Sequence, residues 1–178
     1  MYTKIDDWLK ARPEVSAKSK ITPLAPPEKI EIAPEGTADM VVTFRNVHNW
    51  MASDSQKAYF AAFFRALKLG GTLGVVEHRA DAKGKSDPKA KSGYVLEKDV
   101  IKLAESVGFK LVATSEINAN AKDTKDYPEG VWTLPPTLRL KDKDQARYVA
   151  IGESDRMTLK FTKPDKAAKN GKKKKSKT

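Results

Sequence analysis

The residues best suited to chemistry lie in two short polar segments, 45–50 (RNVHNW) and 77–79 (EHR). Each segment follows a run of apolar and β-branched residues, which is typical of a buried strand. In an open α/β sheet, ligands bind beyond the carboxyl ends of the parallel strands. If the two strands are parallel neighbours, both histidines and both arginines gather at one rim of the sheet.

A histidine at such a rim can act as a general base on a substrate hydroxyl or amine. His48 and Asn46 are therefore the candidate catalytic residues, and Glu77, His78 and Arg79 are candidates for the substrate-facing rim. The alternative is that polar residues follow any strand that reaches solvent, so that each histidine is a surface group. Two strand ends that each carry a histidine and an arginine favour the functional interpretation.

Trp132 is a further candidate for the substrate rim. It lies in a long irregular segment, residues 118–144, and long ordered loops often serve as lids or binding elements. The alternative, which has equal weight, is that Trp132 packs with Leu134 and Leu138 and only attaches the segment to the body.

The composition excludes several classes of site. The 178 residues include no cysteine and two histidines, so neither a disulfide nor a multi-histidine metal site is expected. The charged N-terminus does not resemble a signal peptide, and no apolar run approaches the roughly 20 residues that span a bilayer. We therefore expect a cytoplasmic protein without a membrane segment or a resident metal.

The net charge of +11 is concentrated at the C-terminus. Residues 163–178 hold eight lysines and one aspartate, so they carry +7 and leave +4 for the other 162 residues. Such a segment cannot bury an apolar core, so residues 165–178 are expected to form a disordered tail behind a folded domain, residues 1–164. The tail is either a solubilising end or a weak contact for a polyanion through Lys172, Lys173, Lys174 and Lys175.

The central part of the chain predicts a strand–helix–strand unit. Residues 39–44 read as a strand buried on both faces, and Ser53 with Gln56 fits a capping box at the start of a helix. Gly70 stands where a helix-terminating residue is wanted, and residues 72–77 read as the second strand. Short turns between these elements favour a right-handed parallel crossover.

The flanking segments give weaker signals. We expect a helix over residues 5–15, a short strand over 21–24, a polar loop over 81–93 and a helix over 96–107. A strand follows at 110–117. The alternation of Met157, Leu159 and Phe161 predicts a last strand, 156–163, near an edge of the sheet.

Four segments together resemble a family of predicted bacterial class I methyltransferases. They are ADMVVTFRNVHNWM, LKLGGTLGVVEHRA, SGYVLEKDVIKLAESVGFKL and the run from SEINANAKDTKDYPEGVWTLPPTLRL to YVAIGESDRMTLKFTKP. The resemblance covers about residues 2–164. It implies the later strands of a Rossmann-like α/β sheet, mostly parallel with an antiparallel final strand, and S-adenosylmethionine as methyl donor. It also implies cofactor contacts at Arg45, Asn46 and Val47.

The chain departs from that family pattern before residue 38. The family begins with a strand, a glycine-rich loop for the cofactor, a helix and a second strand, and Gly70, Gly71 and Gly74 cannot replace that loop because they precede a strand. In the family's strand order, 3-2-1-4-5-7-6, the strand from Asp39 then lacks a neighbour and forms an exposed apolar edge. We expect this edge to be covered by a second copy, a complementing N-terminal chain, or residues 21–24.

Two functions remain open from the sequence. The first is an S-adenosylmethionine-dependent methyltransferase-like protein with an unknown acceptor, whose cofactor binding is impaired or depends on a second chain. The alternative is a non-catalytic remnant or interaction module that contacts a polyanion through its lysine tail.

Overall fold

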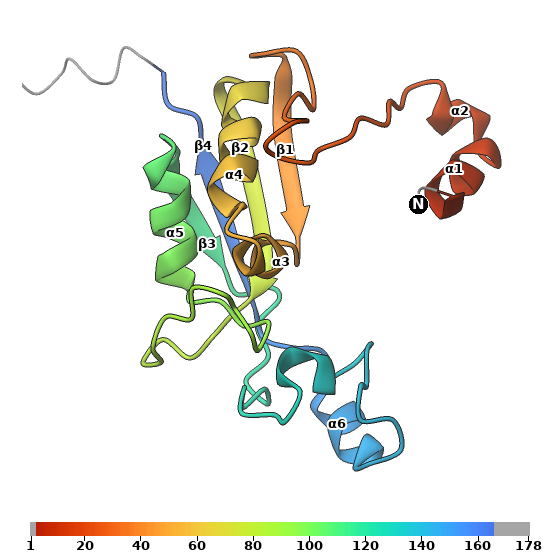
Figure 1. Ribbon diagram of the computed structural model, residues 1–178, viewed down its shortest axis with the longest axis vertical. Coiled ribbons are helices and arrows are strands. Elements are labelled where there is room, and N and C mark those ends of the chain that lie inside the picture. Colours follow the sequence, from red (N-terminus) through yellow and green to blue (C-terminus); the bar gives the residue numbers. More distant parts are fainter. Residues whose placement is uncertain (1–2, 166–178) are drawn as a thin grey trace, which may run out of the picture.

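The computed structural model describes residues 3–165, and its centre is a four-stranded mixed sheet (Figure 1). The tail after residue 165, with its proposed polyanion contact, lies outside the described residues. The strands lie in the order β1-β2-β4-β3 and comprise β1 (Ala38–Phe44), β2 (Leu67–His78), β3 (Lys110–Ser115) and β4 (Arg156–Thr162). β1 pairs in parallel with β2, whereas β4 runs antiparallel to both β2 and β3. This is the expected α/β sheet, mostly parallel with an antiparallel final strand.

The parallel crossover from β1 to β2 is confirmed, but its details differ from the prediction. The expected loop after β1 contains a short helix, α3 (Val47–Ala52), and the main helix α4 (Gln56–Ala66) begins after Ser53. Ser53 does not cap α4, because its hydroxyl bonds the Trp50 carbonyl and the Ser55 hydroxyl. Gly70 lies within β2 with a φ of 76°, so the helix ends earlier and the strand begins earlier than predicted.

Helices cover one face of the sheet, and the main core lies between them. Phe60 and Phe63 of α4, together with Val100 and Ala104 of α5 (Glu97–Ser106), pack against apolar side chains of β2 and β4. On β4 these are Met157, Leu159 and Phe161, each at most 1% exposed, so the predicted alternation is confirmed. The strand lies near an edge as predicted, since β4 is the neighbour of the edge strand β3, but it is paired on both sides.

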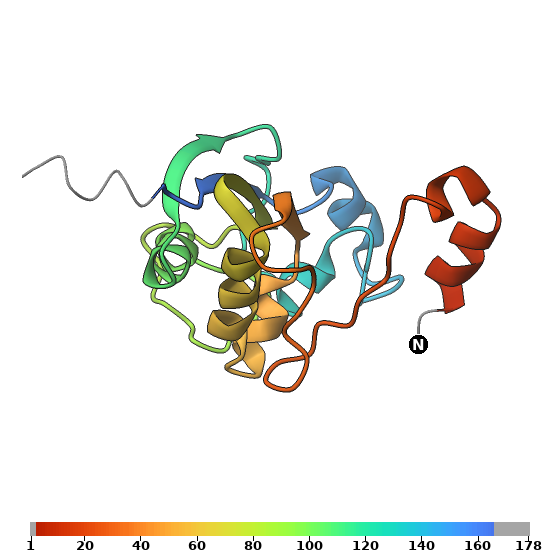
Figure 2. The same cartoon turned by 90° about the horizontal axis from the view of Figure 1, so that it is seen from above.

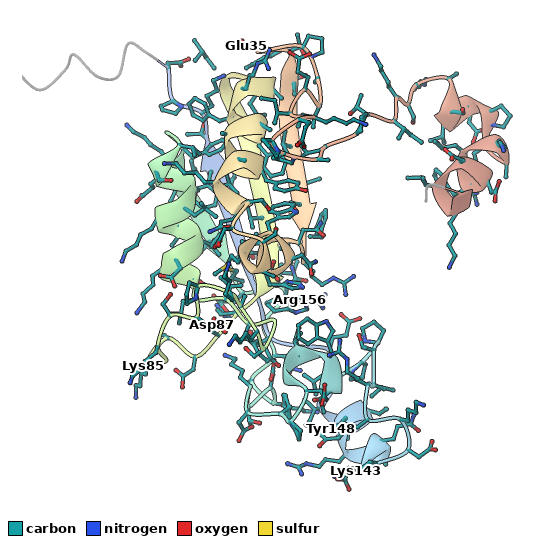
Figure 3. All side chains as sticks on the ribbon, viewed as in Figure 1. Glu35, Lys85, Asp87, Lys143, Tyr148 and Arg156 are labelled. Carbon is teal, nitrogen blue, oxygen red and sulfur yellow. The ribbon has the colours of Figure 1, made fainter. Side chains whose placement is uncertain are left out.

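The segment between β3 and β4 forms a separate small lobe at the carboxyl end of β2 (Figure 1). It contains the 3₁₀ helix η1 (Gly130–Thr133) and a helix that the sequence reading missed, α6 (Gln145–Ile151). Tyr127, Leu134 and Tyr148 form its own apolar cluster. Figure 3 shows Tyr148 at the opposite end of the molecule from Glu35.

The N-terminal segment forms two helices, α1 (Thr3–Lys10) and α2 (Pro13–Ser16), which stand apart from the sheet (Figures 1 and 2). Pro13 starts α2, which explains why a single helix over 5–15 is not formed. The predicted strand over 21–24 is absent, because this segment makes no ladder with β1. Among the described residues, no helix is long and apolar enough to cross a membrane.

β1 is an edge strand with an open apolar face. Val41 and Thr43 point toward the helices, whereas Met40, Val42 and Phe44 on the opposite face are 62%, 53% and 57% exposed. The prediction that this strand is buried on both faces is therefore wrong within residues 3–165, because the helices pack on one side only. The prediction of an exposed apolar edge is correct, and nothing in the described part of the chain pairs with it.

We expect the chain to self-associate through β1, because an unpaired edge with an apolar face is a template for another strand. Val42→Lys places a charge on this face and is expected to shift the chain toward monomer in sedimentation equilibrium. Val112→Lys is a matched control, since Val112 is 55% exposed on the other edge strand. A wild-type chain that is monomeric at high concentration would contradict the expectation, as would equal effects of the two substitutions.

Candidate functional site

A buried carboxylate organises the carboxyl ends of β1 and β2. Glu77 is fully buried, and its oxygens accept hydrogen bonds from the backbone N–H of His48 (3.2 Å) and of His78 (2.8 Å). Its Oε1 also lies 2.9 Å from Nδ1 of the His48 ring. Glu77 therefore joins the first turn of α3 to the end of β2 and brings the two histidines together. The predicted convergence of His48 and His78 is confirmed, with ring centroids 5.4 Å apart.

The contact with Glu77 fixes the orientation and the tautomer of His48. A carboxylate only accepts hydrogen bonds, so Nδ1 of His48 carries the proton. In the neutral ring, Nε2 is then left with a free lone pair. This carboxylate–imidazole arrangement is the one that orients a general base.

His78 has a different environment. Its Nδ1 lies 2.6 Å from the hydroxyl of Ser154, and its side chain is buried. Burial lowers the pKa of His78 to about 4, against the opposing charge of Glu77, and the positive charge of Arg45 contributes to the lowering. His78 is therefore uncharged at neutral pH and can accept or donate a hydrogen bond there.

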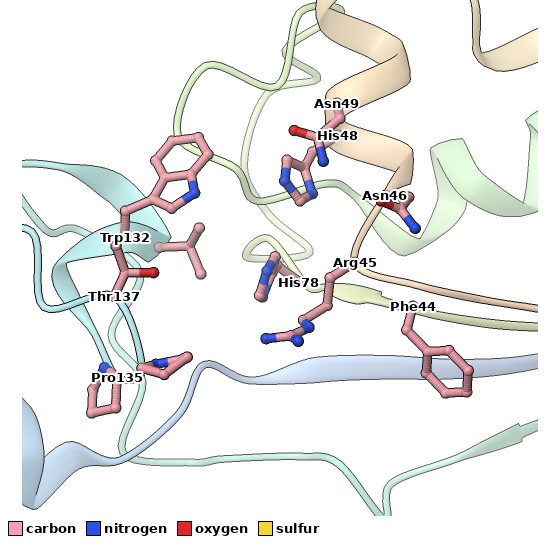
Figure 4. Close-up of a pocket in the computed structure, with 11 residues that line it drawn as sticks. Phe44, Arg45, Asn46, His48, Asn49, His78, Trp132, Pro135 and Thr137 are labelled. Carbon is pink, nitrogen blue, oxygen red and sulfur yellow. The ribbon is translucent and has the colours of Figure 1, made fainter. Parts of the chain in front are cut away.

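Both rings border a cavity of about 350 Å³ at the sheet rim (Figure 4). The guanidinium of Arg45 extends into it, and Trp132 and Pro135 form the opposite wall. Asn46 and Asn49, at the start of α3, are also lining residues. The rim predicted from the segment 45–50 is thus a real concave site, with polar groups on the sheet side and flat apolar groups facing them.

The lobe reaches the cavity because two loops approach closely. The Val131 N–H donates a hydrogen bond to the Ser92 carbonyl (2.9 Å). A side chain at position 130 would clash with the same carbonyl, because its Cβ would lie 2.2 Å from the oxygen, so glycine is needed there. Trp132 then meets His48 edge-on, with ring centroids 5.9 Å apart, and Arg139 lies 4.6 Å from its ring centroid. The packing interpretation holds for Leu134 and Leu138 in the lobe cluster, whereas Trp132 borders the cavity.

Arg79 does not join this rim, so that part of the prediction is wrong. Its guanidinium binds Asp155 (2.9 and 3.1 Å) and Glu116 (2.6 and 2.9 Å), with Glu97 at 3.4 Å. The hydrogen bonds that Arg79 donates to Glu116 and Asp155 raise the pKa of Arg79 above its ordinary value. Burial opposes ionisation of Asp155, but its bonds to Arg79 and Lys125 outweigh this and lower its pKa to about 2. This network connects the ends of β2, β3 and β4 and is structural.

Two other predicted roles need correction. The side chain of Val47 is fully buried in the core, so it has only backbone groups to offer a cofactor. Glu77 lies beneath the rim and acts through His48, without lining the cavity. Sequence reasoning missed Ser154, whose partner His78 is 76 residues away, and Pro135, which carries no signal of a site.

The side chains of His48, Glu77 and His78 form one cluster of groups that commonly bind metal ions. Within residues 3–165 each offers a ligand atom, and these atoms lie within 4.8 Å of one another. Three hydrogen bonds engage the Glu77 carboxylate, so a metal ion bound there would have to compete with them.

Comparison with known protein families and with curated proteins finds no match. Among solved structures, the [4+2]-cyclase SpnF matches with a TM-score of 0.55 and 16% identity, over 89% of this chain and 60% of that chain. The chain thus spans well under two thirds of that structure. A 1,6-didemethyltoxoflavin-N1-methyltransferase from Burkholderia thailandensis has a TM-score of 0.47 and 13% identity, over 76% of this chain and 48% of that one.

A TehB-like S-adenosylmethionine-dependent methyltransferase from Corynebacterium glutamicum has a TM-score of 0.41 and 19% identity, over 75% of this chain and 50% of that one. The strand order β1-β2-β4-β3, with β4 antiparallel, is the 4-5-7-6 part of the order expected for class I methyltransferases. The chain therefore has part of a Rossmann-like α/β fold, with the strand order that the resemblance implies for the later strands. Since one fold hosts many reactions, its activity must be argued from the site.

The buried, uncharged state of His78 predicts a pH-dependent stability. Its folded pKa of about 4 lies below the ordinary value of 6.5, so the unfolded chain binds more protons between these pH values. The free energy of unfolding should therefore fall as the pH is lowered from 6.5 to 4, by up to about 3 kcal/mol. Urea denaturation of wild type and His78→Gln at a series of pH values measures this. The variant should lose most of the slope in this window, and an unchanged slope would contradict the assignment.

Proposed function

We propose that this chain provides the acceptor-binding and proton-accepting side of an S-adenosylmethionine-dependent methyltransferase. The acceptor is a hydroxyl or an amine that enters the cavity between His48 and Trp132. When bound, S-adenosylmethionine would supply the methyl group by breaking its S–CH3 bond and leaving as S-adenosylhomocysteine. The proton that the acceptor oxygen or nitrogen loses passes to Nε2 of His48. The methyltransferase-type fold and the position of the cavity beyond the parallel strands support this reaction class.

The observation that carries the proposal is the 2.9 Å contact between His48 Nδ1 and Glu77. It holds the proton on Nδ1, so that the basic nitrogen Nε2 is the one left for the acceptor. When His48 becomes protonated, Glu77 stabilises the imidazolium at a distance that needs no rearrangement. Asn46 and Asn49 supply amide groups to position the acceptor.

The described residues do not form a complete site for the methyl donor. S-adenosylmethionine needs groups for its amino-acid end and its ribose, which a glycine turn between strand and helix and an acidic residue supply in the family that the sequence resembles. Gly70, Gly71 and Gly74 lie within β2, and Val47 is buried. Arg45 and Asn46, the other two donor contacts that the resemblance implies, line the cavity and face the acceptor there. We therefore assign no donor-binding step to residues 3–165.

Donor binding is proposed to require additional polypeptide along β1. The open edge and the exposed side chains of Met40, Val42 and Phe44 lie beside the carboxyl end where the donor would sit. A strand added there would extend the parallel sheet and pair with the open backbone groups of β1, and polypeptide packed beside it would cover the apolar face. A second copy of the chain or a complementing chain could supply it.

The alternative function is a non-catalytic interaction module. The observation in its favour is the same open edge, which offers unpaired backbone groups to a partner strand. A module of this kind needs β1 but does not need the His48–Glu77 pair. The two functions are therefore separated by a substitution at His48.

We expect His48→Gln to lower methyl transfer about 100-fold or more, because a positioned general base contributes factors of this size. The assay combines the full chain with S-adenosylmethionine at high concentration and a panel of phenols and amines, and detects methylated products by mass spectrometry. Lys57→Gln, an exposed substitution on α4, is the control and should leave the rate unchanged. An unaffected rate in His48→Gln would contradict the proposal. Because donor binding is proposed to require additional polypeptide along β1, absence of product from the chain alone bears on that polypeptide and not on His48.

A further inference from the structure

Arg45 differs from the other arginines in the described part of the chain, because it has neither a carboxylate nor an aromatic partner there. Four of the others form ion pairs, and the remaining two lie over aromatic rings. The ion pairs are Arg65 with Glu31 and Glu35, Arg79 with Glu97, Glu116 and Asp155, Arg139 with Glu129, and Arg156 with Glu153. The rings are Trp8 under Arg12 and Tyr148 under Arg147.

The unpaired guanidinium is directed into the cavity. Arg45 follows β1 in the left-handed backbone region, with a φ of 55° and its N–H bonded to the Val76 carbonyl (2.8 Å). Figure 4 shows its side chain extending away from Phe44, beneath His78 and toward Pro135, into the space that Trp132 faces. A residue held in this uncommon conformation at the mouth of a cavity is consistent with a ligand contact.

Among the described residues that line the cavity, none is acidic, so none neutralises Arg45. Glu77, which lies beneath the rim, is fully buried and engaged by three hydrogen bonds. His78 is uncharged at neutral pH. A guanidinium in such a site favours a planar anion, because its N–H groups match both oxygens of a carboxylate.

The remaining walls favour a flat, largely apolar body. Trp132, Pro135 and Pro136 present ring surfaces, and the volume of about 350 Å³ is at the small end of the range for small-molecule sites. A ligand that satisfies the whole cavity has a carboxylate for Arg45, a ring for the wall and a hydroxyl for His48.

We propose that the acceptor is a small aromatic hydroxy acid, with its carboxylate on Arg45, its ring beside Trp132 and its hydroxyl at Nε2 of His48. The role of the hydroxyl rests on the proposed function, whereas the Arg45 contact is a binding claim that needs no methyl transfer. Arg45 is thereby a substrate contact that determines specificity, in place of the cofactor contact implied by the sequence.

The test is calorimetric titration of the full chain at pH 7 with 4-hydroxybenzoate and with its uncharged counterpart, 4-hydroxybenzamide. The acid should bind about tenfold to a hundredfold more tightly, as a charge-assisted pair is lost in the amide. Arg45→Gln should remove this difference by weakening the acid alone, and Arg45→Lys should retain part of it. Arg147→Gln, an arginine of the lobe that lies over Tyr148, is the matched control and should leave both affinities unchanged.

Equal affinities of the acid and the amide in wild type would overturn the proposal, and so would an acid preference that survives Arg45→Gln. Binding of neither compound, or a preference for inorganic phosphate over the aromatic acid, would also overturn it. Acid binding that depends on Arg45, together with a methyl-transfer rate that His48→Gln leaves unchanged, would uphold the anion site and refute the proposed role of His48. The two claims can therefore fail separately.

Discussion

The site depends on one buried carboxylate. Glu77 sits at the end of β2 with no exposure to solvent, and it receives the backbone N–H groups of His48 and His78 as well as the His48 ring. A buried carboxylate is costly unless it is fully hydrogen-bonded, so its three partners must hold their places. The requirement to satisfy this one group sets where α3 begins, how the β1 and β2 ends meet and which nitrogen of His48 faces the cavity.

The architecture explains why acceptor-binding groups are present and a complete donor site is not. Helices α4 and α5 cover one face of the sheet, and the lobe between β3 and β4 closes over the rim with Trp132. The other face of β1 stays open within residues 3–165. The proposed proton acceptor, His48, lies on the closed side of the rim, whereas the proposed donor side adjoins the open strand. The same additional polypeptide along β1 would thus complete the proposed donor side and cover the apolar edge.

Local patterns predicted the parts of the fold that depend on local physics. The strand–helix–strand unit, the parallel pairing and the meeting of His48 with His78 follow from apolar periodicity and from the geometry of parallel crossovers. The start of α4 and the place of Gly70 were missed by a few residues, since tertiary packing overrides capping and propensity at element ends.

Contacts between distant residues could not be predicted from one sequence. Arg79 was wrongly predicted to lie at the rim, because its partner Asp155 is 76 residues away in the sequence and no local pattern indicates their contact. The bond of His78 to Ser154 spans the same separation. The place of β4 between two strands likewise depends on long-range pairing. The resemblance implied this order, but no local pattern of the sequence does. That Arg45 lacks a carboxylate or aromatic partner within residues 3–165 follows only from three-dimensional contacts.

Proton acceptance by His48 depends on its own proton lying on Nδ1, where it is donated to Glu77. Long-range ¹H–¹⁵N correlation spectra of the histidine side chains, assigned with His78→Gln, measure this directly because the chain has two histidines. The account predicts that neutral His48 is the Nδ1–H tautomer with an unprotonated Nε2, and that Glu77→Gln disturbs this state. A neutral His48 that is predominantly the Nε2–H tautomer would contradict the account, because the nitrogen facing the cavity could then not accept a proton.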